Sequence, residues 1–178
     1  MKFVPHPAVA LFCLLSSVYC AGEARAQGVR VKLPAWPEFV LLDTLRQDHE
    51  VRAPADVVYR AVLDAYKSLG IPPGNTSGEL GIVGSERFQR MRTLAGAPMS
   101  LSFSCGDGAT GPNADSFRLT IAIVTWVKPT TGGNTTLGIA SAAAGEAIEG
   151  VRRNPRECAS LGRVEEKILK EVKKLTGG

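Results

Sequence analysis

The sequence predicts an α+β domain, with an antiparallel sheet of about five strands and two helices on one face. Two observations lead to this class. Apolar residues recur at helical spacing in two segments, residues 55–69 and about 160–175. Segments of strand length, alternating or apolar, fill the chain between them and one precedes the first helix. The predicted order is therefore β-α-β-β-β-β-α.

The first 26 residues have the parts of a secretory signal peptide. Lys2 gives a positive start, an apolar run extends from Ala8 to Leu15, and Ala24-Arg25-Ala26 forms a small-residue exit before Gln27. The run is shorter than the roughly 20 apolar residues that cross a bilayer. We therefore expect cleavage near Gln27, export to the periplasm or the extracellular space, and no transmembrane span after cleavage. A retained N-terminal anchor is the alternative.

Removal of this segment leaves 152 of the 178 residues, a usual size for one domain. A chain that is 44% hydrophobic and 21% charged can build a core. Without Lys2, Glu23 and Arg25 the net charge falls from +4 to +3. This mild charge, with no dense basic stripe and interleaved aromatic residues, speaks against a nucleic-acid partner.

Residues 27–48 form a leader segment before a single domain at 49–178. Each proline in Leu33-Pro34-Ala35-Trp36-Pro37 disfavours helix at the residue before it. The apolar run 39–42 follows as a short strand or a surface segment. The leader is interpreted either as packing on the domain edge or as an exposed docking segment.

The body begins with a short strand at 50–52 and a helix at 55–69. Pro54 suits the first turn of a helix, and Asp56 suits its positive end. Gly70 ends the helix. Its apolar stripe contains Val58, Ala61, Val62, Ala65, Tyr66 and Leu69.

Four strands are expected next, at 80–88, 99–105, 117–127 and 136–146. Met99–Cys105 alternates strictly, which predicts one buried face. A turn at Gly132-Gly133-Asn134 joins the last two strands into a hairpin over 117–146. In that hairpin we expect Ile121 and Ile123 on the inner face and Thr120 on the other.

The return strand has small residues on one face. This face contains Gly138, Ala140, Ala142 and Ala144. Missing side-chain bulk permits close approach of another group. Two interpretations remain open: the C-terminal helix packs on this face, or a small apolar ligand occupies the gap between helix and sheet. The helix itself has an apolar stripe consisting of Leu161, Val164, Ile168, Val172 and Leu175.

The cysteines agree with export. Two cysteines, Cys105 and Cys158, remain after the signal segment, and in an exported chain such a pair most often forms a disulfide. The alternative is two separate buried thiols. Cys20 is preceded by Tyr19, where a lipobox has a small residue, so an outer-membrane lipoprotein is not expected.

Residues 52–63, Arg-Ala-Pro-Ala-Asp-Val-Val-Tyr-Arg-Ala-Val-Leu, resemble the entry to START-like domains and the small helix-grip domains of BamC-like lipoproteins. The resemblance implies a long C-terminal helix across a curved sheet. The BamC-like element order fits better, because START-like domains have a larger sheet and extra short helices. The segments at 105–106, 111–115 and 158–162 also resemble uncharacterised exported bacterial proteins, which implies no activity.

No catalytic or cofactor motif is found in the sequence. His49 is the one histidine after the signal segment, and a structural zinc site needs about four Cys or His ligands. Cys105 ends an apolar face, which favours a structural role over a nucleophile. Gly106, Gly108 and Gly111 spell G-x-G-x-x-G, but a strand rather than a helix is expected to follow, so this segment is a hairpin connection. We expect no enzyme and no cofactor.

These observations favour an exported, non-enzymatic domain that binds another component of the cell envelope. The alternative is a carrier for a small apolar ligand in the gap between the C-terminal helix and the sheet. The partner is expected to be an envelope protein or that ligand.

Overall fold

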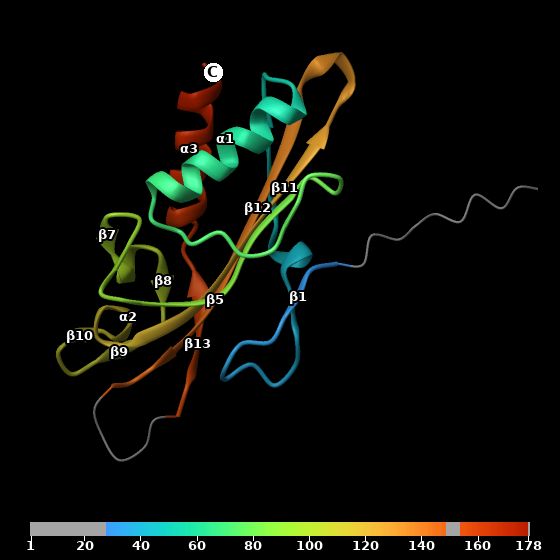
Figure 1. The fold of residues 1–178 in the computed structure, drawn as a ribbon. Helices are drawn as coiled ribbons and strands as arrows, with labels where there is room; N and C mark the ends of the chain where they lie inside the picture. The colour runs from blue at the N-terminus through green and yellow to red at the C-terminus, as the bar shows by residue number, and fades with distance from the viewer. Residues whose placement is uncertain (1–27, 149–153, 178) are drawn as a thin grey trace, which may run out of the picture.

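The computed structural model describes residues 28–148 and 154–177, and it has an α+β fold built on a seven-stranded antiparallel sheet (Figure 1). The predicted signal peptide at 1–26 lies outside the described residues. The sheet follows the order β4 (Thr76–Ser77), β5 (Ile82–Met91), β11 (Arg118–Pro129), β12 (Thr135–Glu146), β13 (Arg156–Ser160) and β8 (Phe103–Ser104), and β3 (Gln47–Val51) also pairs with β12.

The β11–β12 hairpin is the centre of the sheet and confirms the prediction for residues 117–146. Its strands pair without interruption from Arg118 opposite Glu146 to Pro129 opposite Thr135. The short 3-10 helix η3 (Thr131–Gly133) makes the turn, with both of its glycines at positive φ. Glycine is the residue that adopts this conformation at least steric cost, which explains the Gly-Gly pair.

β12 has two different strands along its second edge. β3 pairs with residues 135–139 of β12, and β13 pairs with residues 143–145. In the described part of the chain, residues 140–142 have no strand partner on this edge. The sheet is therefore broken at this point, between the end of one edge strand and the start of another.

Both long helices, α1 (Ala55–Ser68) and α3 (Arg163–Thr176), cover the same face of the sheet (Figure 1). Ile168 and Val172 of α3 are fully buried in one core with Leu137 and Ile139 of β12. The predicted stripes form most of this contact. The exceptions are the ends of the α3 stripe, because Leu161 lies before the helix and Leu175 lies in its last turn, and both are exposed.

The N-terminal segment covers the opposite face. It forms a hairpin of β1 (Arg30–Val31) and β2 (Val40–Leu41), followed by the 3-10 helix η1 (Leu42–Leu45). Lys32 Nζ closes the loop of this hairpin by donating to the carbonyl oxygens of Trp36 and Pro37. Both faces of the central strands are consequently buried.

The predicted strand at Met99–Cys105 is wrong over most of its length, and only Phe103–Ser104 pair as a strand, β8. Residues 99–101 form a 3-10 helix, η2 (Met99–Leu101), after the small hairpin of β6 (Thr93–Leu94) and β7 (Ala97–Pro98). The Asp115 carboxylate accepts hydrogen bonds from Ser100 N at 2.8 Å and Ser100 Oγ at 2.7 Å, which stabilises the turn. Met99 and Phe103 are buried as expected, but Leu101 is exposed.

Gly108 and Gly111 lie in a small hairpin of β9 (Asp107–Gly108) and β10 (Gly111–Pro112), and Gly106 directly precedes it. This agrees with their interpretation as a hairpin connection. The expectation that a strand directly follows these glycines is wrong, because the one-turn helix α2 (Asn113–Ser116) comes first and links β10 to β11.

Candidate functional site

The small-residue face of β12 does not contact the C-terminal helix. Ala140, Ala142 and Ala144 belong to the core that the N-terminal segment forms, together with buried Leu33 and Leu42. A strand exposes alternate residues to opposite faces, and α3 packs on the other set. The prediction that the helix packs on these residues is therefore wrong, because the leader segment covers them.

Gly138 belongs to the same face but lies beside a charged pair. A Cβ on this glycine would lie 2.5 Å from Arg46 Cδ and 2.7 Å from Asp48 Oδ1. Arg46 Nε and Asp48 Oδ1 are 2.8 Å apart. The small face thus accommodates protein side chains along its length, which explains its lack of bulk without a ligand.

The disulfide between Cys105 and Cys158 is present, as predicted. Cys158 lies in β13, and Cys105 follows β8, the strand that pairs with β13. The bond crosslinks two neighbouring segments at the edge of the sheet. Gly145 of β12 lies against it, since a Cβ there would be 3.1 Å from Cys158 Sγ and 3.3 Å from Cys105 Sγ.

A cleft of about 560 Å³ lies at the break in the sheet, and we call it the edge cleft. Three apolar side chains form its rim: Trp36, which is half-buried, and the exposed Leu45 and Leu161. Four polar side chains also line it: Gln47, Ser141, Ser160 and Glu165. The N-terminal segment, β12, β13 and α3 all contribute to this one cavity.

Glu165 is the buried polar group of the edge cleft. It is the third residue of α3, and its side chain is 4% exposed. Its Oε1 accepts hydrogen bonds from Ser141 Oγ at 2.5 Å and from Ser160 Oγ at 2.8 Å. Its Oε2 is shielded from solvent and has no hydrogen-bond partner among the described residues. Such an oxygen is costly to bury, so its presence in a cleft calls for a reason.

The start of α3 favours a carboxylate at this position. Gly162 precedes the helix with φ 79°, and its N–H donates to Ser160 Oγ at 3.2 Å. Negative charge in the first turn interacts favourably with the helix dipole. The serines and the helix end therefore hold the carboxylate in place.

The field of Glu165 extends into the core. Burial raises the pKa of the Tyr66 phenol well above its ordinary value. The hydrogen bond with Thr125 lowers this pKa, and the nearby Glu165 carboxylate raises it further. Tyr66 is fully buried in α1 and also donates to the carbonyl oxygen of Val83 at 3.3 Å.

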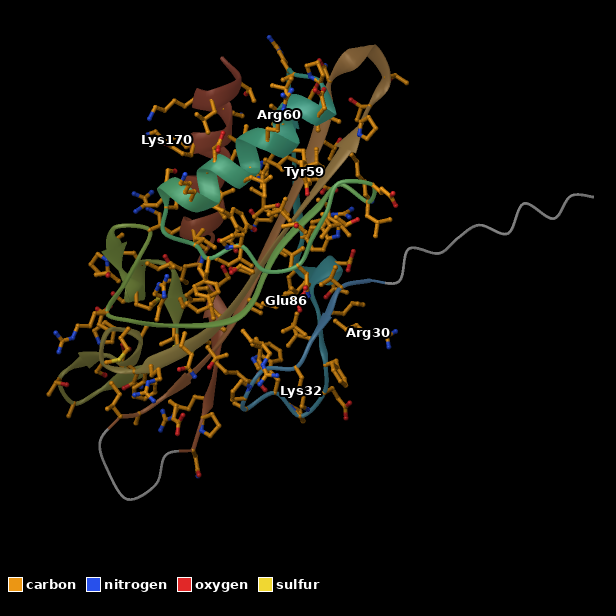
Figure 2. The ribbon with its side chains drawn as sticks, viewed as in Figure 1. Arg30, Lys32, Tyr59, Arg60, Glu86 and Lys170 are labelled. Atoms are coloured by element: carbon orange, nitrogen blue, oxygen red, sulfur yellow. A yellow bond between two sulfur atoms is a disulfide. The ribbon has the colours of Figure 1, made fainter. Side chains whose placement is uncertain are left out.

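A second cleft, of about 620 Å³, lies at the start of α1. Tyr59 and Arg60, which line it, are labelled on α1 in Figure 2. Arg60 there forms an exposed ion pair with Asp56 at 2.9 Å. Among the described residues, no polar side-chain atom that lines this cleft is both buried and unpaired. The edge cleft is therefore the stronger candidate.

Sequence reasoning missed the edge cleft. Glu165 carries one usable signal, since it lies three residues before Ile168 and seven before Val172, on the apolar side of the helix. Trp36, Ser141 and Ser160 carry no such signal, because the break in the sheet that brings them together arises from strand pairing.

Within the described ranges, no group of three or more His, Cys, Asp or Glu residues could hold a metal ion. Over the same ranges, no helix has the length and apolar character that a membrane span requires.

No protein-family model matches the sequence, and no curated protein matches it significantly.

Proposed function

We propose that the protein is an exported, non-enzymatic domain that binds another protein of the cell envelope at the edge cleft. The observation that carries the proposal is the combination of an apolar rim with a buried carboxylate whose Oε2 lacks a partner in the described structure. The residues that dominate a protein–protein interface fill desolvated pockets that are ringed by contacts excluding water.

Export is supported by the features of residues 1–26 and by the disulfide. Disulfides persist in oxidising compartments and are rare in the cytosol. N-terminal sequencing of the protein from its native host should begin near Gln27. Intact Met1 in the cytosol would contradict export, and an acylated N-terminus at Cys20 would mean lipidation.

A helix-grip arrangement of the BamC-like kind is part of the proposal. The length of α3 and its place over β12, beside α1, support it. A more distant likeness to START-like domains would suggest a ligand between helix and sheet. That carrier function has less support, since fully buried Ile168 and Val172 occupy the space against Leu137 and Ile139.

Photo-crosslinking in intact cells tests the function. A photo-reactive amino acid is placed at Leu45, on the rim, or at Leu175, at the end of α3; the two side chains are 45% and 47% exposed, which makes them a matched pair. We expect one envelope protein to be crosslinked from Leu45 and not from Leu175. Equal crosslinking from both positions, or none from Leu45, would contradict the proposal. A co-purified small molecule in native mass spectrometry would favour the carrier instead.

A further inference from the structure

We propose that the outer edge of β5 binds an extended acidic segment of a partner protein, which joins the sheet as a further strand. This inference goes beyond the proposed function, because no residue of β5 lines the edge cleft. It starts from the pairing of β5. One edge of β5 pairs with β11 over most of its length, whereas on the other edge β4 pairs only with Ile82 and Val83.

The open part of this outer edge extends over residues 86–91. Next to β4, the backbones of Gly74 and Asn75 continue the cover through hydrogen bonds with Gly84. Beyond that point, no strand in the described part of the chain pairs with β5 on this side. An unpaired strand edge presents a row of backbone N–H and C=O groups to which another strand can pair. Extended peptides bind proteins by adding to such edges.

Positive charge dominates the open edge and determines which strand suits it. Its three arginines are Arg87, Arg90 and Arg92, and its one carboxylate is Glu86. Glu86 accepts a hydrogen bond from Asn75 Nδ2 at 3.3 Å. Within the described structure, none of the three arginines forms an ion pair. Opposite charges on paired strands stabilise the pair and like charges destabilise it, so this edge favours an acidic strand over a second copy of itself.

Two of these arginines lie where the backbone favours glycine. Arg87 has φ 57° and Arg92 has φ 64°, a conformation that glycine adopts at least steric cost and that glycine takes at most of the other positive-φ positions of the described chain. Both side chains are exposed. Arg90 differs, because it donates to the carbonyl oxygens of Gln89 and Gly70 at 3.1 and 2.8 Å. Unfavourable backbone conformations are concentrated at functional sites, which supports a role for Arg87 and Arg92 outside the chain.

A β-bulge sets the length of the site. Glu86 and Arg87 together lie opposite Ala122 of β11, and regular pairing resumes at Phe88. The regular stretch between the two arginines at positive φ is therefore Phe88–Met91. Bulges and charged side chains protect a strand edge from indiscriminate pairing. Because the charge here has one sign, the protection is selective: it acts against a second copy and admits a strand of opposite charge.

Two blocked heptapeptides test the inference on the purified protein. One alternates threonine with glutamate, and the other alternates threonine with glutamine. We expect the glutamate peptide to bind about tenfold more tightly, since several exposed ion pairs each contribute a small gain. It should also slow hydrogen exchange of backbone amides within residues 86–91. Equal affinity of the two peptides, no binding of either, or binding without slower exchange would overturn the inference.

Variants then locate the preference. Arg87→Gly combined with Arg92→Gly should remove the tenfold preference and leave the melting temperature unchanged or higher, because glycine suits positive φ. Arg30→Gln combined with Arg60→Gln is the matched control, which removes two charges from exposed arginines elsewhere and should keep the preference (Figure 2). A preference that survives the glycine variant would overturn the inference. A lower melting temperature of that variant would also overturn it, by giving the two arginines a structural role.

Two further measurements address other occupants of this edge. The protein should sediment as a monomer, and a dimer with slowed exchange in residues 86–91 would overturn the inference in favour of a second copy. Phosphatidylglycerol vesicles should bind the unmodified protein and the glycine variant equally. Vesicle binding that the glycine variant abolishes would overturn the inference by pointing to a lipid surface. Each of these failures leaves the crosslinking from Leu45, and with it the proposed function, unaffected.

Discussion

The indole N–H of Trp36 donates a hydrogen bond to the carbonyl oxygen of Ala143 over 3.2 Å, although the two residues are 107 positions apart. This bond ties the N-terminal segment to the central strand β12. Apolar contacts accompany it, since Leu33 and Leu42 are buried with Ala140 and Ala142. The leader is therefore a structural layer of the domain.

Leu33→Ala tests this layer. Leu33 is 1% exposed, so its truncation should lower the free energy of unfolding by about 2–5 kcal/mol through loss of burial and formation of a cavity. Phe39→Ala is the control in the same hairpin, because Phe39 is 62% exposed, and it should cost within about 1 kcal/mol. Urea denaturation measures both. Equal, small losses would mean that the leader contributes little to the stability of the fold.

Substitutions on the two faces of β11, in the β11–β12 hairpin, should differ in their effect on the free energy of unfolding. Ile123 is fully buried between the sheet and the helices, and Ile123→Ala should lower the free energy of unfolding by about 2–5 kcal/mol. Thr120 lies on the opposite face near the start of β11, and Thr120→Ala should lower the free energy of unfolding by about 1 kcal/mol or less, because only a small side chain is shortened. Chemical denaturation again compares them. A loss at Thr120 as large as at Ile123 would contradict the assigned faces.

The sequence predicted the elements with long, regular patterns. The stripe of α1 and the β11–β12 hairpin follow directly from residue spacing. The prediction of a strand over Met99–Cys105 was wrong because its alternation of residues also suits a turn. The hydrogen bonds that Ser100 donates to the Asp115 carboxylate, 15 positions along the chain, stabilise that turn. Short local patterns are overridden by such tertiary contacts.

The assignment of faces on β12 failed for a related reason. Alternation shows which residues share a face, and not what covers that face. The proline-rich leader gave no sign that Leu33 and Leu42 would cover Ala140 and Ala142. The edge cleft depends on the same long-range pairing, since β3 and β13 meet β12 from distant parts of the chain.

The disulfide should be a main contributor to stability. The bond between Cys105 and Cys158 joins residues 53 positions apart, and the chain-entropy estimate for a loop of this size is about 4 kcal/mol. Mass spectrometry of an unreduced digest should find the two cysteine peptides joined, with a gain of two hydrogens on reduction. Reduction should also lower the melting temperature. An unchanged melting temperature would mean that the bond is dispensable for the fold.

Stability at high pH should depend on Tyr66. Because burial raises the pKa of Tyr66 in the folded protein, the unfolded chain loses this proton first as the pH rises past about 10. The contribution of Tyr66 is complete below that pH and then falls by about 1.4 kcal/mol per pH unit. Tyr66→Phe should remove this part of the alkaline slope, whereas Tyr59→Phe should keep it. Denaturation from pH 8 to pH 11 measures the difference, and identical slopes in all three proteins would contradict it.

Glu165 should limit the stability of the fold. An unpaired buried acceptor costs about 1–3 kcal/mol, and Glu165→Met replaces it with an apolar side chain of similar length. Ser141 and Ser160 can still bond to each other across 3.1 Å. We therefore expect Glu165→Met to raise the free energy of unfolding by about 1 kcal/mol.

Glu166→Met is the control for this substitution. Its side chain is exposed, so the free energy of unfolding should change by no more than about 0.5 kcal/mol. Thermal and urea unfolding of the three proteins decide the result. A stability loss above about 1 kcal/mol in Glu165→Met would show that the carboxylate, through Ser141 and Ser160, holds the start of α3 in place. Glu165 would then have a structural role, and the apolar rim would carry the binding.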